Sequence, residues 1–324
     1  MRAIQCLEWA GPERLRLADV PVPDPTAGQV RIRVAAAGVN FPDALIVQRK
    51  YQVQPPLPFV PGTEVAGTVD AVGPGVSALE PGERVVAFVG IGGFAEFVCA
   101  AQEQVAPVPA GVDMTVAAGF TLTYATSQHA LAERGRLAAG ETLLVLGAGG
   151  GVGLAAVELG KLAGARVLAA ASSAAKLDAA RRAGADELID YSAGDLREAV
   201  RSLTDGRGVD VVYDPVGGAY TAAALRTLAW RGRLLVVGFA AGEIAQIPAN
   251  ALLLREASAI GVYWGEFAKH DPEGNRRLLA QLFAWLAQGR LRPLVSKEYP
   301  LAETPQALVD LLARRAVGKL VVRP

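Results

Sequence analysis

A run of glycines stands between an apolar segment and a helical one. Thr142 to Leu146 has the composition of a buried strand, residues 147–153 read Gly-Ala-Gly-Gly-Gly-Val-Gly, and Leu154 to Ala163 has the composition of a helix. Such a turn lets a phosphate approach the backbone, where amide groups and the positive end of the helix face its charge. The order predicts a dinucleotide-binding loop whose contact residues are Gly147, Ala148, Gly150, Gly151, Val152 and Gly153.

Alanine stands where the usual fingerprint of this loop has its first glycine, since the matching register is Ala148-x-Gly150-x-x-Gly153. A glycine-rich turn that binds no ligand is therefore the alternative interpretation.

The segment after the next apolar run bears on which dinucleotide would bind. Sites for NAD place an acidic residue about 20 positions after the loop, where it accepts from the ribose hydroxyls. Residues 167–175 contain no acid, while Ser172, Ser173 and Lys176 offer two hydroxyls and an ammonium. These groups suit the 2′-phosphate of NADPH, so the sequence favours NADPH over NADH. The alternative is that a serine caps the next helix and that Lys176 is solvated on its first turn.

Continuous apolar runs alternate with Ala- and Leu-rich helical stretches from about residue 115. Uniformly apolar strands between helices are typical of a parallel sheet that is covered on both faces. This part of the chain therefore predicts a doubly wound α/β domain. Its strands are expected at Thr142 to Leu146, Arg166 to Ala171, Val209 to Tyr213, Arg233 to Val237 and, as the sixth strand, Ala257 to Val262.

The first 110 residues are instead rich in short strand-like segments separated by turn formers such as Pro61-Gly62 and Gly73-Pro74-Gly75. They predict an all-β or partly open barrel unit. The last segment, Lys319 to Val322, is strand-like again, which indicates that the tail returns to complete this first domain.

The composition limits the possible partners. The 324 residues include 32 basic and 32 acidic side chains, which gives no broad basic field for nucleic acid, so a small molecule is the expected partner. Two cysteines and two histidines lie far apart in the sequence and predict no zinc site. We expect a cytoplasmic protein, because neither a signal peptide nor a membrane span is evident.

Several motifs together resemble the zinc-independent quinone oxidoreductase branch of the medium-chain dehydrogenase/reductase superfamily. They are Ala36 to Asp43, Leu57 to Gly67, the Gly147 to Gly153 loop and Asp214 to Gly218. The resemblance implies a GroES-like, β-rich catalytic domain at residues 1–118 and 264–324, and a Rossmann NADP-binding domain at residues 119–263. It also implies a homodimer that forms through the Rossmann domains.

Two positions depart from the zinc-dependent alcohol dehydrogenases of that superfamily. Asn40 stands where those enzymes have a metal-binding cysteine, and Gly62-Thr63-Glu64 stands where they have Gly-His-Glu. Neither Asn40 nor Thr63 is a good zinc ligand. We therefore expect no metal, and a reaction that needs none, because alcohol oxidation in those enzymes depends on a Lewis acid.

The resemblance also implies roles for individual residues. Asn40 is expected to face the nicotinamide, with Asp43 and Thr63 in support, and Tyr51 falls where related enoyl reductases have a catalytic tyrosine. The remaining residues implied as cofactor contacts are Thr126 on the nicotinamide side, Tyr191 near the adenosine phosphate, Gly238 and Phe239 at the carboxyl edge of the sheet, and Lys319 near the cofactor phosphates.

The predicted function is NADPH-dependent reduction of a quinone. One alternative is reduction of α,β-unsaturated carbonyls or enoyl thioesters, which uses the same hydride geometry and the same Tyr51. Another is an NADPH-binding protein with a structural or sensing role. At the level of single residues, Asn40 could only form an Asx-turn, and Tyr51 could only fill the wall of a cleft.

Overall fold

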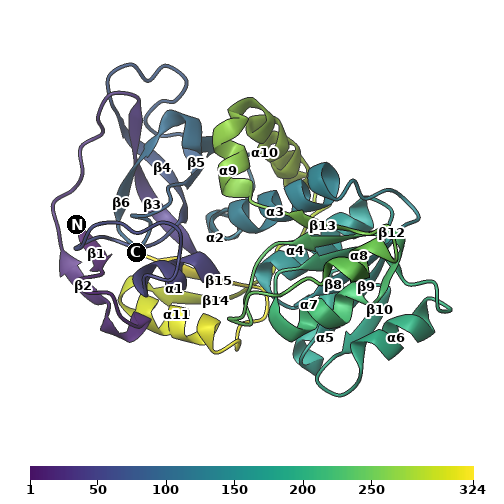
Figure 1. Ribbon diagram of the computed structural model, residues 1–324. Helices are drawn as coiled ribbons and strands as arrows, with labels where there is room; N and C mark the ends of the chain where they lie inside the picture. The colour runs from purple at the N-terminus through teal and green to yellow at the C-terminus, as the bar shows by residue number, and fades with distance from the viewer. The chain divides into compact units, whose positions relative to one another are not determined.

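The chain passes several times between two units in the computed structural model, which describes residues 1–324. Unit 1 contains Met1–Leu122, Leu279–Gly289 and Pro293–Pro324, and unit 2 contains Thr123–Leu278 and Arg290–Arg292. Both ends of the chain therefore belong to unit 1, in line with the strand-like tail (Figure 1).

The boundaries of the units differ from the implied division at three places, the smallest being Arg290–Arg292, which lie in unit 2. Residues 264–278 lie in unit 2, where the ring of Phe267 stacks on His129 with centroids 4.3 Å apart. Residues 119–122 lie in unit 1, where the Leu122 amide donates to the Glu64 carboxylate over 2.8 Å. These side-chain contacts could not be inferred from the composition of the segments.

Unit 1 is built on a mostly antiparallel sheet of seven strands. The order is β14-β15-β3-β4-β5-β7, and β6 pairs with β3. The returning tail supplies β14 and β15, and β15 lies antiparallel to β3, with Leu320 opposite Val39. The strands are β3 (Gln29–Val39), β4 (Glu64–Val72), β5 (Arg84–Phe88), β6 (Phe97–Ala101), β7 (Val105–Pro107), β14 (Val295–Pro300) and β15 (Lys319–Arg323), and a separate pair is formed by β1 (Arg2–Gln5) and β2 (Arg16–Asp19).

Short helices complete unit 1 around a core that includes Ile4, Ile32, Phe94 and Tyr299. The α-helices are α1 (Phe41–Val47), α2 (Met114–Ala118) and α11 (Thr304–Leu312), and the 3₁₀ turns are η1 (Pro12–Arg14), η2 (Gln102–Gln104) and η4 (Leu301–Glu303). The first half of β3 alternates buried and exposed side chains, as its period-two pattern predicted.

Unit 2 has the predicted parallel sheet of six strands, in the order β10-β9-β8-β11-β12-β13. Every neighbouring pair in it is parallel. The strands are β8 (Thr142–Leu146), β9 (Arg166–Ala171), β10 (Glu187–Asp190), β11 (Val209–Asp214), β12 (Leu228–Val236) and β13 (Ser258–Gly261). All five side chains of β8 are buried, which agrees with its uniform apolar sequence.

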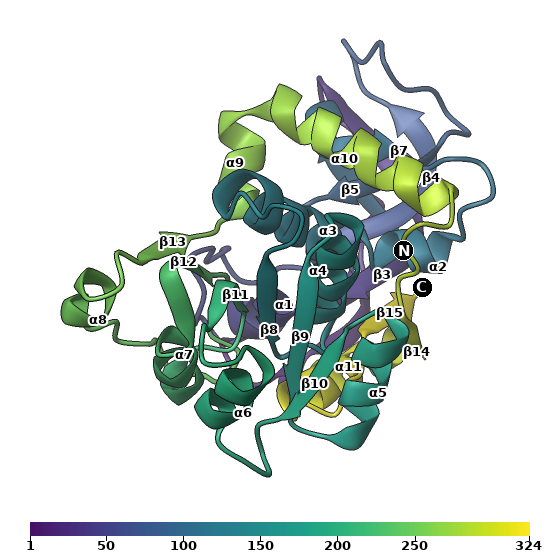
Figure 2. The same cartoon turned by 90° about the vertical axis from the view of Figure 1, so that its right-hand side faces the viewer.

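Helices connect the successive strands of this sheet, and Figure 2 shows β13 at the end of the sheet beside α8. They are α4 (Gly151–Leu162), α5 (Ala174–Arg182), α6 (Leu196–Leu203), α7 (Gly218–Leu225) and α8 (Ala249–Leu253), and α9 (Trp264–His270) follows the last strand, β13. The chain enters unit 2 through α3 (Thr121–Gln128) and a π-helical turn, η3 (His129–Arg134), and leaves it through α10 (Pro272–Ala287). The two units thus have the architecture predicted, a β-rich domain and a doubly wound α/β domain with a parallel sheet.

Two further sequence expectations concern the environment of the protein. No helix of the chain has both the length and the apolar character that a membrane span needs. The thiols of Cys6 and Cys99 are free, with no disulfide between them.

Candidate active site

The glycine loop of unit 2 turns sharply from β8 into α4. Gly147 has a φ of +58°, in the left-handed region that favours glycine, and Gly150 is the N-cap residue of α4. The Ala148 amide donates to the Ala170 carbonyl over 3.0 Å, which fastens the loop to the end of β9. The structure thus has the strand, turn and helix in the order predicted.

Two glycines of this loop serve different physical purposes. A Cβ atom on Gly153 would lie 2.2 Å from the Gly147 carbonyl oxygen, so only glycine lets the helix approach the turn. A Cβ atom on Gly150 would have only that same oxygen within reach, at an ordinary 3.5 Å. The backbone at Gly150 is therefore accessible, as binding of a pyrophosphate to the amides and the positive end of α4 requires.

The residues predicted to bind the 2′-phosphate lie next to this loop. Ser173 is the N-cap residue of α5, yet its hydroxyl makes no capping hydrogen bond, which removes the capping alternative for this side chain. Lys176, in the first turn of α5, packs directly against the loop, since a Cβ on Gly149 would lie 2.4 Å from the Lys176 Cβ. Ser172 is exposed between β9 and α5. These groups fit a phosphorylated dinucleotide.

The other predicted cofactor residues of unit 2 lie at strand ends or on α3. The Gly238 amide donates to the carbonyl of Asp214 over 3.3 Å, which places Gly238 and the neighbouring Phe239 beside the carboxyl end of β11. Tyr191 follows β10 and packs on the ring of Tyr220, with centroids 4.7 Å apart. In open parallel sheets, this carboxyl edge is where ligands bind.

Thr126 is half-buried on α3, and its neighbour Ser127 explains how α3 is positioned. The buried Ser127 hydroxyl donates to the carbonyl of Val152 over 3.0 Å and lies 2.9 Å from the hydroxyl of Tyr213. Ser127 therefore ties α3 to the glycine loop. Sequence reasoning missed this role, because a serine inside a helix carries no signal of the distant backbone group it contacts.

Unit 1 holds a second group of predicted residues, which are gathered around Asn40. The Asn40 side chain is almost fully buried, and its Nδ2 donates to Glu64 Oε1 over 2.9 Å and lies 3.2 Å from Thr63 Oγ1. Its Oδ1 accepts from the Lys319 ammonium. Asn40 is the N-cap residue of α1, and its side chain also belongs to a buried polar cluster of Asn40, Asp43, Thr63, Glu64 and Lys319.

Among the predicted site residues, Lys319 has the environment that differs most from the one expected. The resemblance implied a contact with the cofactor phosphates, but the Lys319 ammonium is buried and lies 2.7 Å from Glu64 Oε1. Burying an ammonium is costly without a partner, and Glu64 supplies the opposite charge. The chain also makes room for the lysine, since a Cβ on Gly119 would lie 2.6 Å from the Lys319 Cγ. Lys319 is thus a structural cation of unit 1.

Glu64, which the sequence showed only as part of the Gly62-Thr63-Glu64 motif, has a central place in this cluster. One oxygen accepts from Lys319 and Asn40, and the other accepts from the Leu122 amide. Glu64 therefore anchors the last residue of unit 1 before the chain enters unit 2. The Gly62-Thr63-Glu64 motif was the only signal that pointed to it.

Asp43 completes the cluster and is fully buried. Its Oδ2 accepts from the Asn40 amide over 2.8 Å, while its Oδ1 has no hydrogen-bond partner. Burial raises the pKa of Asp43 to about 7, because desolvation penalises the carboxylate more than its hydrogen bond and the nearby Lys319 favour it.

This shift predicts a pH-dependent contribution to stability. Asp43 has a pKa near 3.8 in the unfolded chain, so its contribution is fully present below about pH 4 and is lost as pH rises through 7. Asp43→Asn cannot titrate but keeps an oxygen for the Asn40 amide. In urea denaturation from pH 4 to 7, the wild type should lose stability relative to the variant by up to roughly 1.4 kcal/mol per pH unit. If the unfolding free energies of the two proteins changed in parallel with pH, the pKa of Asp43 would not be raised in the folded protein.

Tyr51 is the remaining residue of unit 1 to which the resemblance implied a catalytic role. It is half-buried and packs against the hydrophobic core of unit 1, as a residue of a cleft wall would. Its predicted role as a proton donor stays a prediction.

The donor set around Asn40 does not suit zinc. An amide, a hydroxyl and an ammonium stand beside the carboxylates, and no group of three or more His, Cys, Asp or Glu side chains in the structure could hold a metal ion.

Comparisons with known proteins cover most of the chain. Residues 26–110 match a family model described as alcohol dehydrogenase GroES-like domain, and residues 151–281 match one described as zinc-binding dehydrogenase. A quinone oxidoreductase-like protein 2 homolog from Nematostella vectensis is 39% identical over 91% of this chain and 81% of its own length.

Solved structures extend the similarity over the whole chain. A mycobacterial protein solved in complex with NADPH is 36% identical with a TM-score of 0.94, and both chains are covered fully. The quinone oxidoreductase of Escherichia coli, also solved with NADPH, has a TM-score of 0.94 and 28% identity, again with full coverage of both chains. With the motifs predicted from its sequence, its two-unit fold and these relatives, the chain belongs to the quinone oxidoreductase family of the medium-chain dehydrogenase/reductase superfamily.

Proposed function

We propose that this protein is an NADPH-dependent quinone oxidoreductase that acts on a small-molecule quinone without a metal ion. The observation that carries the proposal is the glycine loop of unit 2 with Lys176 packed against Gly149. A lysine whose side chain begins at the loop, beside a backbone turn that is open at Gly150, supports binding of a phosphorylated dinucleotide. Relatives over the full length of the chain are quinone oxidoreductases, and two similar structures were solved with NADPH.

The residues of unit 2 would hold the cofactor along the carboxyl edge of the sheet. The Gly147–Gly153 loop and the start of α4 would bind the pyrophosphate, and Ser172, Ser173 and Lys176 would bind the 2′-phosphate. Tyr191, Gly238, Phe239 and Thr126 are the further proposed contacts. When bound, NADPH supplies the hydride.

Lys176→Ala tests the choice of cofactor. The substitution should make the binding free energy of NADPH less favourable by about 1.5–3 kcal/mol, because a charge-assisted contact to the 2′-phosphate is lost. Binding of NADH should change little, since NADH lacks that phosphate. Fluorescence titration of both cofactors measures the difference, and equal losses for the two would remove Lys176 from the 2′-phosphate site.

Reduction of a quinone by hydride requires few catalytic groups from the protein. A quinone that accepts hydride becomes a stabilised hydroquinone anion, which water can protonate, so the site must mainly orient the ring and exclude competing reactions. We assign the orienting function in unit 1 to Asn40, Asp43 and Thr63, held by Glu64 and Lys319. The structure gives Asn40 no unused amide hydrogen, so a donor to the acceptor oxygen would be Tyr51 or water.

A panel of acceptors tests this function. With NADPH, turnover of 1,4-quinones should exceed that of enones and enoyl thioesters, whose more basic enolate needs a positioned donor. Tyr51→Phe should leave quinone reduction within about twofold and lower any enone or thioester turnover by roughly 10²-fold. Loss of quinone turnover in this variant, with binding of NADPH intact, would make Tyr51 essential and contradict protonation by water.

The proposed independence from metal rests on donor chemistry. Asn40 Oδ1, the oxygen that a cation could approach, already accepts from the Lys319 ammonium. A second cation at this place would be repelled by Lys319 and would have an amide and a hydroxyl as ligands, which zinc disfavours.

A homodimer through unit 2 is the proposed assembly. The edge strand β13 pairs only with β12, and edge strands offer unpaired backbone groups to a second copy. Large apolar side chains are exposed nearby in the sequence, at Trp230, Leu253 and Leu254, where single chains rarely leave such a surface uncovered. Sedimentation velocity that returned only the mass of one chain at micromolar concentration would contradict this assembly.

A further inference from the structure

Four arginines from three segments of unit 2 line one hollow of roughly 240 Å³. Arg197 and Arg201 come from α6, Arg226 follows α7, and Arg255 follows α8. The other lining residues are Val200, Gly206, Gly208 and Thr227, so no acidic side chain lines the hollow. Convergence of like charges is unfavourable unless an anion offsets it.

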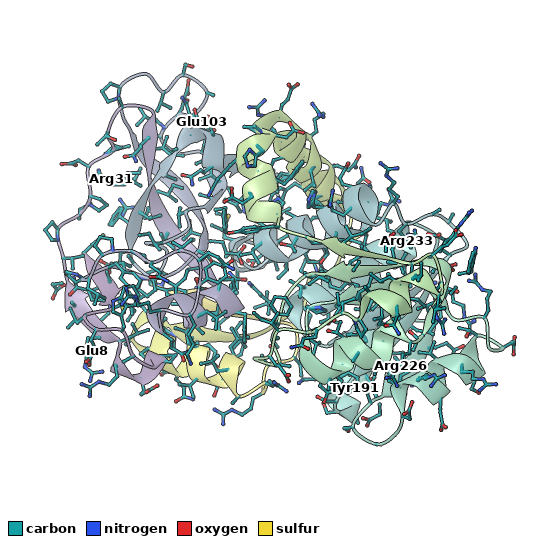
Figure 3. The ribbon with its side chains drawn as sticks, viewed as in Figure 1. Glu8, Arg31, Glu103, Tyr191, Arg226 and Arg233 are labelled. Atoms are coloured by element: carbon teal, nitrogen blue, oxygen red, sulfur yellow. The ribbon has the colours of Figure 1, made fainter.

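The guanidinium groups in this hollow are mostly without protein partners. The guanidinium groups of Arg197, Arg201 and Arg226 are exposed and form no hydrogen bond or ion pair with another side chain, while Arg255 donates to the Leu228 carbonyl, which holds it in place. Several other arginines of unit 2 do have partners; Arg233, labelled with Arg226 in Figure 3, lies 2.7 Å from Glu141. The unpaired donors of the hollow can therefore accept a ligand without breaking an existing contact.

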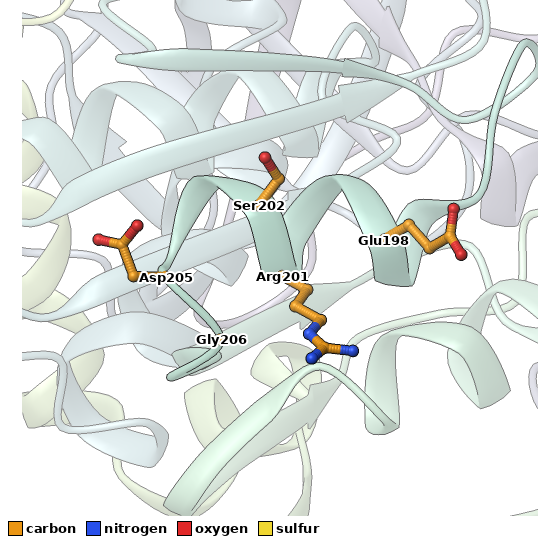
Figure 4. Close-up of a pocket in the computed structure, with 5 residues that line it drawn as sticks. All are labelled: Glu198, Arg201, Ser202, Asp205 and Gly206. Carbon is orange, nitrogen blue, oxygen red and sulfur yellow. The ribbon is translucent and has the colours of Figure 1, made fainter.

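Acidic residues lie near the hollow but not in it. A neighbouring, shallower hollow of roughly 550 Å³ is lined by Glu198, Arg201, Ser202, Asp205 and Gly206. Figure 4 shows that the Arg201 side chain extends from α6 on the side opposite Ser202 and away from Asp205. Arg201 forms no ion pair with Glu198 or Asp205.

Stabilisation of helix ends explains only part of the cluster. Arg201 and Arg226 lie at the ends of α6 and α7, where a cation suits the helix dipole. Arg197 lies in the first turn of α6, where a cation is disfavoured, and it faces Arg201 four residues later. Its position has no such structural benefit.

The hollow lies on the edge of the sheet opposite the glycine loop. Gly208 precedes β11, Thr227 precedes β12, and Arg255 stands shortly before β13, so the hollow is at the amino ends of these parallel strands. The glycine loop follows the carboxyl end of β8, which is parallel to β11. A strand of this length spans about 20 Å, so a ligand in the hollow cannot be the pyrophosphate held by the loop.

From this geometry we infer a second anion site, which binds a free small molecule carrying linked phosphate groups. Guanidinium groups bind phosphate oxygens in pairs of parallel hydrogen bonds, and four of them around one hollow match more than one phosphate. The site goes beyond the proposed reduction of quinones and does not depend on it.

Calorimetric titration with inorganic pyrophosphate, in the presence of saturating NADP⁺ to fill the glycine loop, tests the inference. The wild type should bind one pyrophosphate per chain, and Arg197→Gln/Arg226→Gln should weaken that binding at least tenfold. Arg181→Gln, which changes an exposed arginine of α5 outside the hollow, should bind as the wild type does.

Circular dichroism and turnover with NADPH and a quinone show whether the double variant is folded. Tenfold weaker binding by a folded double variant, with normal binding by Arg181→Gln, supports the site. Absence of binding by the wild type, or equal binding by all three proteins, overturns it, whether or not the protein reduces quinones.

Discussion

Lys319→Met is expected to lower the free energy of unfolding by about 3–5 kcal/mol, the cost of removing one partner of a buried ion pair. The lysine and Glu64 side chains are only 6% and 1% exposed, so water cannot replace the lost ammonium. Asn40 Oδ1 loses its donor in the same variant. Urea denaturation monitored by circular dichroism gives the difference in unfolding free energy directly.

Two matched variants make this prediction specific. Lys319→Met/Glu64→Gln removes the charge that the single variant leaves uncompensated, so it should recover part of the lost stability. Arg231→Met breaks an exposed ion pair with Glu256 and should cost at most about 1 kcal/mol. A loss for Lys319→Met as small as that for Arg231→Met would show that Lys319 is not the structural cation of unit 1.

Gly150→Ala is expected to lower the affinity of the protein for NADPH by about 10- to 100-fold while leaving the fold intact. The added methyl has an ordinary 3.5 Å contact within the protein, and the φ of −85° at Gly150 suits alanine, so the free protein should be unaffected. The methyl would stand where the pyrophosphate approaches the backbone, and a displacement of about 1 Å at such a site can cost 10²-fold. Fluorescence titration measures the affinity, and thermal unfolding of the free protein measures its stability.

Gly194→Ala is the control for Gly150→Ala, because a methyl there meets nothing within 4 Å and Gly194 lies outside the loop. It should change neither stability nor affinity. If Gly150→Ala binds NADPH as tightly as Gly194→Ala does, the pyrophosphate does not lie over the glycine loop.

Local patterns predicted the fold well where one physical requirement dominates a segment. The fully buried β8 had to be uniformly apolar, and the turn that follows needs glycine at Gly147 and Gly153 for reasons of φ and close packing. The return of the tail was visible in the strand-like Lys319–Val322, which became β15 beside β3. Each of these features is determined by residues that are consecutive in the sequence.

Contacts between residues that are far apart in the sequence could not be predicted from local patterns. Lys319 and Glu64 are 255 positions apart, and no local pattern indicates that an ammonium at the end of the chain is buried on a carboxylate near its start. The Ser127 contact with Val152 and the transfer of residues 264–278 to unit 2 likewise depend on tertiary packing. The family resemblance had implied a phosphate partner for Lys319, and a lysine near the end of a chain is normally solvated.

Metal-free reduction of quinones by NADPH can be measured as oxidation of NADPH by 1,4-benzoquinone, followed at 340 nm with the chelator EDTA present. The purified protein should consume one NADPH per quinone reduced, EDTA should leave kcat/KM unchanged, and NADH should be used at least tenfold less efficiently. Activity that disappears in EDTA and returns with zinc, or no quinone-dependent oxidation of NADPH at all, would contradict metal-free reduction of quinones by NADPH.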